Sequence, residues 1–179
     1  MEFDSRDVAL SAVFAALYVV VNVVQMATVG NPTVYGPVQL RVADCLIVLA
    51  AVLGWPVIGG VTLGCFLTNA FYFIGTIDVA LGPVANLFAA TVVFLLRRRH
   101  IIACVAGALP IGLIVGSYLW LFFPPPDAFG FLPAWLGMIA SITLSSLVVV
   151  TVLGYVLLTA ISQPMIIEPL KSRGLKRVT

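Results

Sequence analysis

The sequence predicts an all-α membrane protein, a bundle of six transmembrane helices in a single integral membrane domain over residues 1–179. Of the 179 residues, 62% are hydrophobic and only 9% are charged, and the mean hydropathy is +1.18. A soluble domain carries roughly 25% charged residues, so this composition cannot cover a water-facing surface. The apolar runs are long and unbroken, whereas the strands of a membrane barrel alternate polar and apolar residues.

The first three helices are expected over residues 8–27, 38–53 and 57–74. A membrane helix needs about 20 apolar residues to cross about 30 Å of hydrocarbon. The segment between the first two runs is rich in glycine and proline, which is typical of a loop. The second run is short for a complete span, so we expect this helix to be tilted or to begin inside the protein.

The last three helices are expected over residues 79–96, 101–123 and 132–161. The fourth and the fifth each contain a proline, which removes one backbone donor and can kink a helix. Three consecutive prolines at 124–126 favour an extended backbone in the loop before the sixth helix. The sixth helix is long enough to tilt or to project beyond the bilayer.

The basic residues predict the orientation in the membrane. With six helices, both termini and the loop after the fourth helix lie on one side. Eight of the nine basic residues fall on that side, namely Arg6, Arg97, Arg98, Arg99, Lys171, Arg173, Lys176 and Arg177. Because positively charged loops stay in the cytoplasm, we expect cytoplasmic N- and C-termini, a basic tail over residues 168–179 and a multi-pass protein of the plasma membrane.

The ninth basic residue, Arg41, lies three residues before Asp44 at the start of the second apolar run. That spacing places both side chains on one helical face, one turn apart. An ionisable residue in a membrane helix is costly unless it faces a cavity or a partner, so it indicates a functional site. Arg41 would donate to a bound solute, with Asp44 accepting from it or orienting it. Alternatively, the two only neutralise each other, and Asp44 also suits the dipole of a first helical turn.

Three more polar residues lie near the same, outer end of the predicted bundle. Asp78 and Asn86 would converge on a ligand from the start of the fourth helix. Alternatively, Asp78 is an N-cap that satisfies free backbone N–H groups. Asn69, late in the third helix, would face the ligand or bond to a neighbouring helix.

Several kinds of chemistry are excluded. The chain has no phosphate-binding loop for ATP hydrolysis, and no metalloprotease or nucleophile-elbow motif. Cys45, Cys65 and Cys104 are scattered, and one histidine cannot build a metal site with them. We therefore expect no catalytic residue, no metal and no cofactor, and no nucleic-acid partner.

The order of residues along one stretch resembles a known family. Tyr35-Gly-Pro-Val-Gln39-Leu-Arg41 is followed by Gly64-Cys-Phe-Leu-Thr-Asn69 and by Asp78-Val-Ala-Leu-Gly82. These blocks, within residues 35–90, resemble the QueT-type substrate-binding subunits (S components) of energy-coupling-factor (ECF) vitamin transporters. The family usually has glutamate at the position of Asp44, and smaller polar residues near Pro83 and Asn86.

The resemblance implies an outward-facing pocket and a small planar heterocyclic substrate, a queuosine precursor of the 7-deazaguanine type. Its implied contact residues are Tyr35, Gln39, Arg41, Asp44, Asn69, Asp78 and Asn86. A guanine-like ring presents adjacent N–H donors to a carboxylate and a carbonyl oxygen to an arginine or an amide. Asp78 or Asp44 would take the donor edge, Arg41 the oxygen, and Asn69 and Asn86 the remaining edges.

The resemblance also implies partners. An S component topples in the membrane when it is engaged by a T component, which two cytoplasmic ATPases drive. Ala12 and Ala16 match the small-residue surface that S components offer to the T component, and small residues four apart let two helices approach closely. The rival interpretations are an S component for another vitamin-like heterocycle, a membrane-embedded lipid or isoprenoid enzyme, and a non-transporting scaffold subunit.

Overall fold

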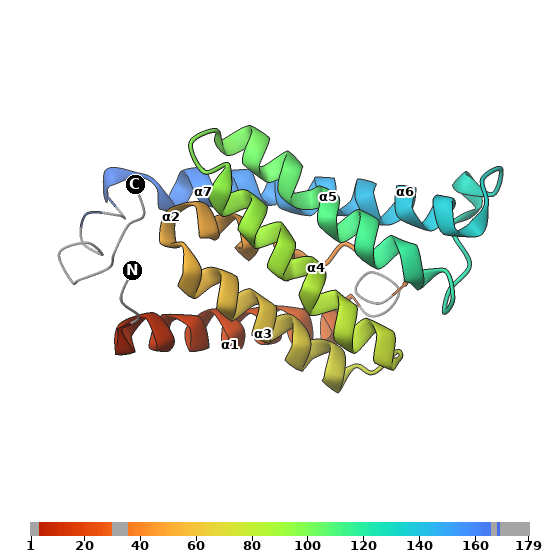
Figure 1. The fold of residues 1–179 in the computed structure, drawn as a ribbon, viewed down its shortest axis with the longest axis horizontal. Coiled ribbons are helices and arrows are strands. Elements are labelled where there is room, and N and C mark those ends of the chain that lie inside the picture. The colour runs from red at the N-terminus through yellow and green to blue at the C-terminus, as the bar shows by residue number, and fades with distance from the viewer. Residues whose placement is uncertain (1–3, 30–35, 166–167, 169–179) are drawn as a thin grey trace.

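The computed structural model describes residues 4–29, 36–165 and 168, and within these every regular element is helical, as Figure 1 shows. The helices are α1 (Ser5–Thr28), η1 (Val42–Leu49), α2 (Ala50–Leu53), α3 (Trp55–Phe71), α4 (Thr76–Leu95), α5 (His100–Leu119), η2 (Asp127–Phe129), α6 (Ala134–Ser146), η3 (Leu147–Leu153) and α7 (Gly154–Ile161). The all-α fold class is therefore confirmed. Among the described residues, six main helical segments follow one another, because η1 continues into α2, and α6, η3 and α7 form one continuous helix.

Two of the six segments are irregular. The second begins as a 3₁₀ helix at Val42, four residues after the predicted start at Val38, since residues 36–41 are not helical. The sixth changes to π-helical winding over η3 before it resumes as α7. η1 and η3 pack against each other, so the tighter and the looser helical windings meet in the interior.

Four helices are long and apolar enough to cross a membrane: Ser5–Thr28, Thr76–Leu95, His100–Leu119 and Ala134–Ile161. The other two apolar helices, Val42–Leu53 and Trp55–Phe71, are shorter. They meet at Gly54, whose φ of 70° lies in a region that only glycine adopts readily. The four long spans match the prediction, and the crossing of the two shorter helices stays a prediction.

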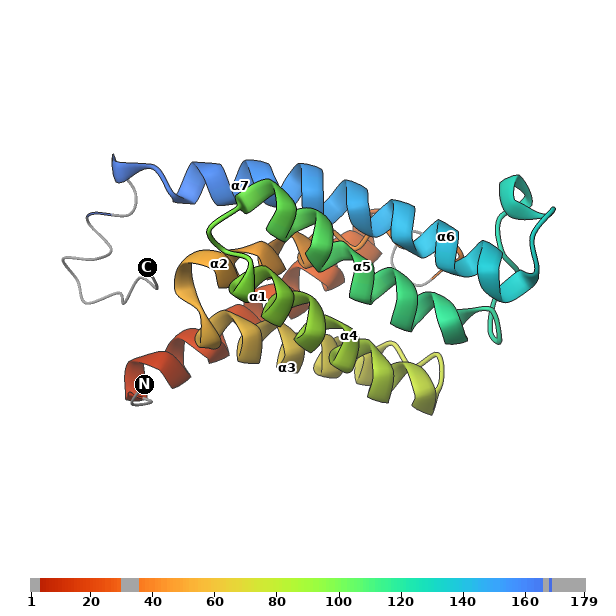
Figure 2. The same cartoon turned by 45° about the horizontal axis from the view of Figure 1, so that its top comes forward.

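The helices are ordered so that α1 packs along α3, α3 along α4, α4 along α5, and α5 along α6 (Figures 1 and 2). Glycine permits the tightest of these approaches. A Cβ atom added to Gly64 would lie 2.7 Å from the Tyr18 Cβ and 2.9 Å from the Ala15 carbonyl oxygen. α3 can therefore press directly on the backbone of α1.

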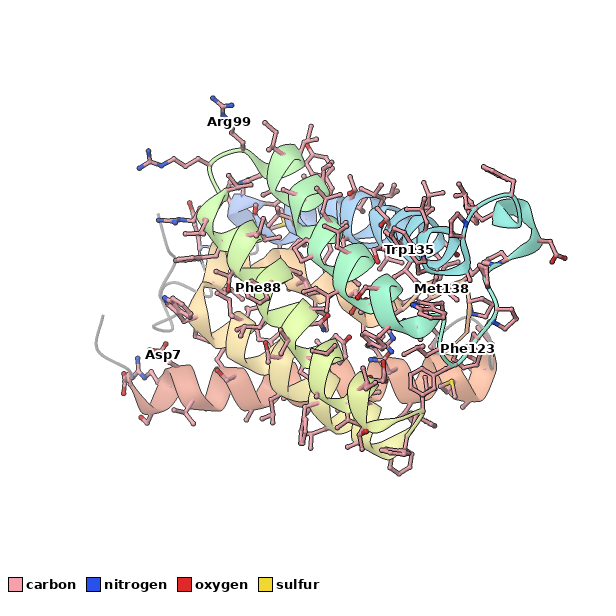
Figure 3. All side chains as sticks on the ribbon, turned by 45° about the vertical axis from the view of Figure 1, so that its right-hand side comes forward. Asp7, Phe88, Arg99, Phe123, Trp135 and Met138 are labelled. Atoms are coloured by element: carbon pink, nitrogen blue, oxygen red, sulfur yellow. The ribbon has the colours of Figure 1, made fainter. Side chains whose placement is uncertain are left out.

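The ends of the bundle differ in charge. The start of α1, the corner between α2 and α3, the turn between α4 and α5, and the end of α7 share one end in Figures 1 and 2. Arg6 and the 97–99 arginines lie at this end, and Figure 3 shows Arg99 pointing away from the helices while Phe123 lies toward the opposite end. The predicted basic tail (171–177) lies outside the described residues. The cytoplasmic placement of this end remains a prediction.

The bundle has an apolar outer surface, and polar side chains are buried within its largely apolar core. Val13 is 59% exposed and Phe88 is 53% exposed, whereas Asn22, Asn69 and Asp78 are completely buried. In water this distribution would be unfavourable, but lipid solvates the apolar side chains, and polar side chains then gather in the interior.

Candidate functional site

Polar side chains from five helical elements form a buried cluster, which we call the polar core. Its members are at most 8% exposed: Tyr18, Asn22 and Gln25 of α1, Gln39 and Arg41 of the segment before η1, Asp44 of η1, Asn69 of α3, Asp78 and Asn86 of α4, and Tyr118 of α5. Because buried polar groups need partners, the geometry of this cluster decides what else it can bind.

Tyr18 connects three elements at one side of the polar core. Its hydroxyl donates to Asp44 Oδ1 at 2.5 Å, and Asn86 Nδ2 donates to the Tyr18 oxygen at 3.0 Å. Asp44 therefore has a partner besides any interaction with Arg41, so mutual neutralisation of the two ions is not its whole role. The tyrosine ties α1 to η1 and α4 through one hydroxyl.

Arg41 is the N-cap of η1, and the Asp44 backbone N–H donates to its carbonyl oxygen at 3.0 Å. A 3₁₀ helix has about three residues per turn, so residues three apart lie on one face. Arg41 itself has an extended backbone just before this helix, so the shared face predicted for Arg41 and Asp44 stays a prediction. The Arg41 side chain is 5% exposed, and its Nη1 lies 3.9 Å from Cys65 Sγ of α3. The guanidinium therefore lies inside the bundle.

Asp78 lies at the other side of the polar core and is completely buried. Tyr118 of α5 donates its hydroxyl to Asp78 Oδ1 at 2.7 Å, and Asn69 Nδ2 donates to the Asp78 backbone oxygen at 3.0 Å. The N-cap interpretation of Asp78 is wrong, because α4 is capped by Gly75 and the carboxylate reaches α5 instead. Asp78 Oδ2 has no hydrogen-bond partner among the described residues.

Gly82 brings the α3 and α4 members of the polar core together. A Cβ atom at this position would overlap the Asn69 amide nitrogen and lie 3.7 Å from Cys65 Sγ. The absence of a side chain at Gly82 therefore places Asn69 and Cys65 against α4. Asn69 bonds to Asp78 and Cys65 lies beside Arg41, so Gly82 lies between the two ionisable residues.

α1 contributes three polar residues at positions i, i+4 and i+7, which share one face. Gln25 bridges the backbone before η1, since its Nε2 donates to the Leu40 oxygen at 2.7 Å and its Oε1 accepts from Val42 N–H at 2.9 Å. Asn22 Nδ2 donates to the Tyr18 backbone oxygen at 3.0 Å. The sequence analysis missed these three residues, although polar side chains at helical spacing in an apolar run were a usable signal.

Six of the seven predicted contact residues belong to the polar core: Gln39, Arg41, Asp44, Asn69, Asp78 and Asn86. Tyr35 lies outside the described residues. The structure buries all six, connects Asp44 with Asn86 through Tyr18 and bonds Asn69 to Asp78, and the role of the six toward a substrate remains a proposal. Ala12 and Ala16, the predicted partner surface, lie on the exposed face of α1, whereas Ala15 packs on α3.

Some polar atoms of the cluster have no hydrogen-bond partner in the described part of the chain. Gln39 Nε2 is such a donor, and Asn22 Oδ1 and Asp78 Oδ2 are such acceptors. Each buried group of this kind destabilises the fold by about 1–3 kcal/mol unless something else satisfies it. A small molecule with both N–H donors and a carbonyl acceptor could do so. Among the described residues, no group of His, Cys, Asp and Glu side chains could hold a metal ion.

Comparison with models of protein families gives a match to the family described as QueT transporter, over residues 8–163. The matched span includes all six helical segments except the first three residues of α1, and it includes every described member of the polar core. No curated protein and no solved structure matches the chain.

Proposed function

The chain belongs to the QueT transporter family, and on that premise we propose that it is the S component of an ECF-type importer that takes up a queuosine precursor or a related 7-deazaguanine. It is a membrane transporter rather than an enzyme, and ATP hydrolysis belongs to partner subunits. The observation that carries the substrate proposal is the polar core, with ionisable and amide side chains buried among apolar helices.

The chemistry of a deazaguanine suits the atoms that the polar core leaves unsatisfied. Asp78 Oδ2 can accept from the adjacent N–H groups of the ring, while Tyr118 holds the other carboxylate oxygen in place. Gln39 Nε2 and the buried Arg41 guanidinium can donate to the ring carbonyl. Asp44 is already bonded to Tyr18, so we assign it to positioning and Asp78 to the donor edge.

In the membrane, all six helical segments would cross the bilayer of the cell, with both termini in the cytoplasm. The shared end of Arg6 and the 97–99 arginines supports this orientation. The exposed Ala12 and Ala16 would face the T component, because their small side chains let a partner helix come close. Two cytoplasmic ATPases would drive the T component.

A titration of the purified chain with a 7-deazaguanine tests the proposal. We expect saturable, stoichiometric binding by the native chain and a loss of at least about ten-fold in affinity for Arg41→Ala, because a hydrogen bond to a charged group contributes about 1.5–3 kcal/mol. Arg6→Ala removes an equal charge from the exposed start of α1 and serves as the control. Thermal unfolding of each variant checks that the fold is retained.

Undiminished affinity in Arg41→Ala would remove Arg41 from the site. Failure of the native chain to bind any deazaguanine, together with saturable binding of another heterocycle, would keep the S-component assignment and change the substrate. Turnover of a lipid by the isolated chain would contradict both.

A further inference from the structure

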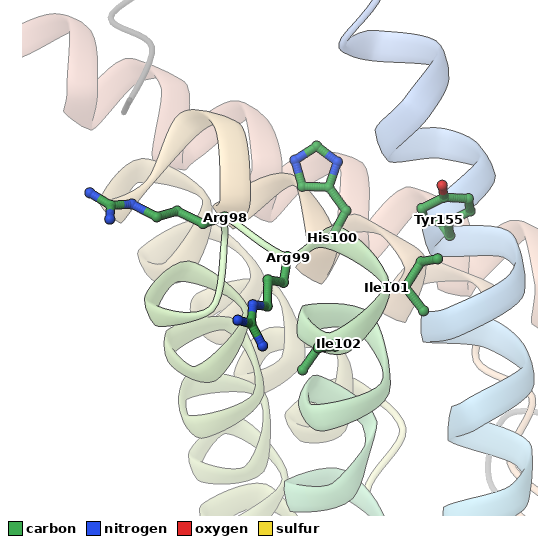
Figure 4. Close-up of a pocket in the computed structure, with 6 residues that line it drawn as sticks. All are labelled: Arg98, Arg99, His100, Ile101, Ile102 and Tyr155. Atoms are coloured by element: carbon green, nitrogen blue, oxygen red, sulfur yellow. The ribbon is translucent and has the colours of Figure 1, made fainter.

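A hollow of about 560 Å³ lies at the basic end of the bundle, outside the polar core. It is lined by residues 98–102, which form the turn between α4 and α5 and the first residues of α5, and by Tyr155 of α7. Figure 4 shows these side chains around the turn, with Tyr155 and Ile101 near each other across the hollow. None of the predicted substrate contacts contributes to it.

The walls of this hollow combine positive charge with apolar surface. Arg98 and Arg99 are exposed and His100 is half-buried, whereas Ile101 and Ile102 are 60% and 47% exposed. Arginines from the turn and isoleucines from the start of α5 line the same hollow, and this combination matches the boundary between phosphate headgroups and acyl chains in a bilayer. Neither water alone nor hydrocarbon alone would solvate both halves well.

Arg97, the residue before Arg98 and Arg99, contacts the preceding helix, α4. Arg97 Nη1 donates to the Phe94 oxygen at the end of α4 at 3.2 Å, and its guanidinium carbon lies 4.6 Å from the centre of the Phe94 ring. The Arg97 side chain is therefore held at the C-terminus of α4. Arg99, the N-cap of α5, is exposed and points away from the bundle.

We propose that this hollow binds the phosphate headgroup of an anionic phospholipid. Arg98 and Arg99 pair with the phosphate, and the first carbons of an acyl chain lie against Ile101 and Ile102. Basic pockets between membrane helices on the cytoplasmic side bind such headgroups. A bound lipid would connect the start of α5 to Tyr155 of α7 across the hollow. Lipid binding at this hollow requires only that the protein lies in a membrane, and it does not depend on which substrate the protein imports.

Native mass spectrometry of the detergent-purified full chain tests this proposal, with phosphatidylglycerol, phosphatidylcholine and inorganic phosphate as separate probes. We expect phosphatidylglycerol adducts to exceed phosphatidylcholine adducts, and phosphatidylglycerol binding to fall about five-fold for each of Arg98→Gln and Arg99→Gln. Arg6→Gln removes the same charge from the same end, outside the hollow, and should leave binding within about two-fold of native. Thermal unfolding of each variant in detergent verifies folding.

Three results would overturn the proposal. Equal binding of phosphatidylglycerol and phosphatidylcholine would show no recognition of the anionic headgroup. Equal losses in Arg6→Gln and Arg99→Gln would show a general effect of surface charge. Competition by millimolar inorganic phosphate that removes the lipid adducts completely would identify a free anion, rather than a lipid, as the occupant.

Discussion

In α1 the buried face is polar and the exposed face is apolar, the reverse of a helix on the surface of a soluble protein. One face carries Tyr18, Asn22 and Gln25, which are buried against η1 and α3. The other carries Ala12 and Ala16 beside exposed valines. On a soluble helix the polar stripe faces solvent, and here it faces the interior because lipid surrounds the bundle.

The difference separates two tasks on one helix. The buried face fixes the polar core, because each of its side chains bonds to the backbone or to a side chain of the same chain. The exposed face makes no such bonds, and its small residues leave space for another helix. Changes on the buried face should therefore alter stability and substrate affinity, whereas changes on the exposed face should alter only association with a partner.

The largest effect is expected where the buried face presses on α3. Gly64→Ala places a Cβ atom 2.7 Å from the Tyr18 Cβ, and overpacking of this kind destabilises by about 1–3 kcal/mol. Gly59→Ala, on the same helix, meets only Ser11 Oγ at 3.6 Å and should be neutral or slightly stabilising. Thermal unfolding in detergent distinguishes the two. Equal unfolding temperatures would mean that α1 does not hold α3 as closely as described.

The next effect concerns the hydroxyl that joins α1 to η1 and α4. Tyr18→Phe keeps the ring and removes the hydrogen bonds to Asp44 and from Asn86. We expect substrate affinity to fall roughly ten-fold, since Asp44 loses a charge-assisted bond of about 1.5–3 kcal/mol. Tyr155→Phe, in α7 and outside the polar core, is the matched control. Native affinity in Tyr18→Phe would show that Asp44 needs no positioning.

A smaller effect is expected at Gln25, which holds the backbone on either side of Arg41. Gln25→Met preserves the length of the side chain and removes its hydrogen bonds to the Leu40 oxygen and from the Val42 N–H. We expect affinity to fall by about five-fold, because each neutral hydrogen bond contributes about 0.5–1.5 kcal/mol. Isothermal titration of this variant beside native protein would measure the change. An unchanged affinity would mean that Arg41 is held by other contacts.

The smallest effect on the isolated chain is expected on the exposed face. Ala12→Leu and Ala16→Leu should leave substrate affinity and unfolding temperature unchanged, since both side chains lie outside the packed interior. Co-purification with the T component should decrease, because larger side chains hold the partner helix away. Val24→Leu enlarges an exposed residue elsewhere on α1 and is the control. Undiminished co-purification of both leucine variants would show that this face does not contact the T component.

Local patterns in the sequence were sufficient for the helices and for part of the polar core. The apolar runs predicted six helical segments, and the polar residues that interrupt them, Arg41 and Asp44 among them, are buried in the structure. The hydrogen bonds of Tyr18 could not be predicted, because its partners Asp44 and Asn86 lie 26 and 68 residues away in sequence. Only the packing of α1 and α4 on the shared neighbours α3 and η1 brings them together.

One local interpretation failed for a physical reason, and one feature of the sixth helix had no local signal. Asp78 has the position and chemistry of an N-cap, but Tyr118, 40 residues later, provides a buried donor to its carboxylate. The sixth helix has no proline or charge to mark its π-helical section, and η3 packs against η1. The Asp78 carboxylate is held by a contact between distant segments, which local sequence patterns do not reveal.

The central claim is that the polar core holds a planar substrate through the buried carboxylate of Asp78. Mass spectrometry of small molecules released from the purified native chain and from Asp78→Asn tests it most directly, with Asp127→Asn, an exposed carboxylate in η2, as the control. We expect a 7-deazaguanine in stoichiometric amount from the native and Asp127→Asn chains, and its loss from a folded Asp78→Asn chain. Equal retention by Asp78→Asn would contradict the claim.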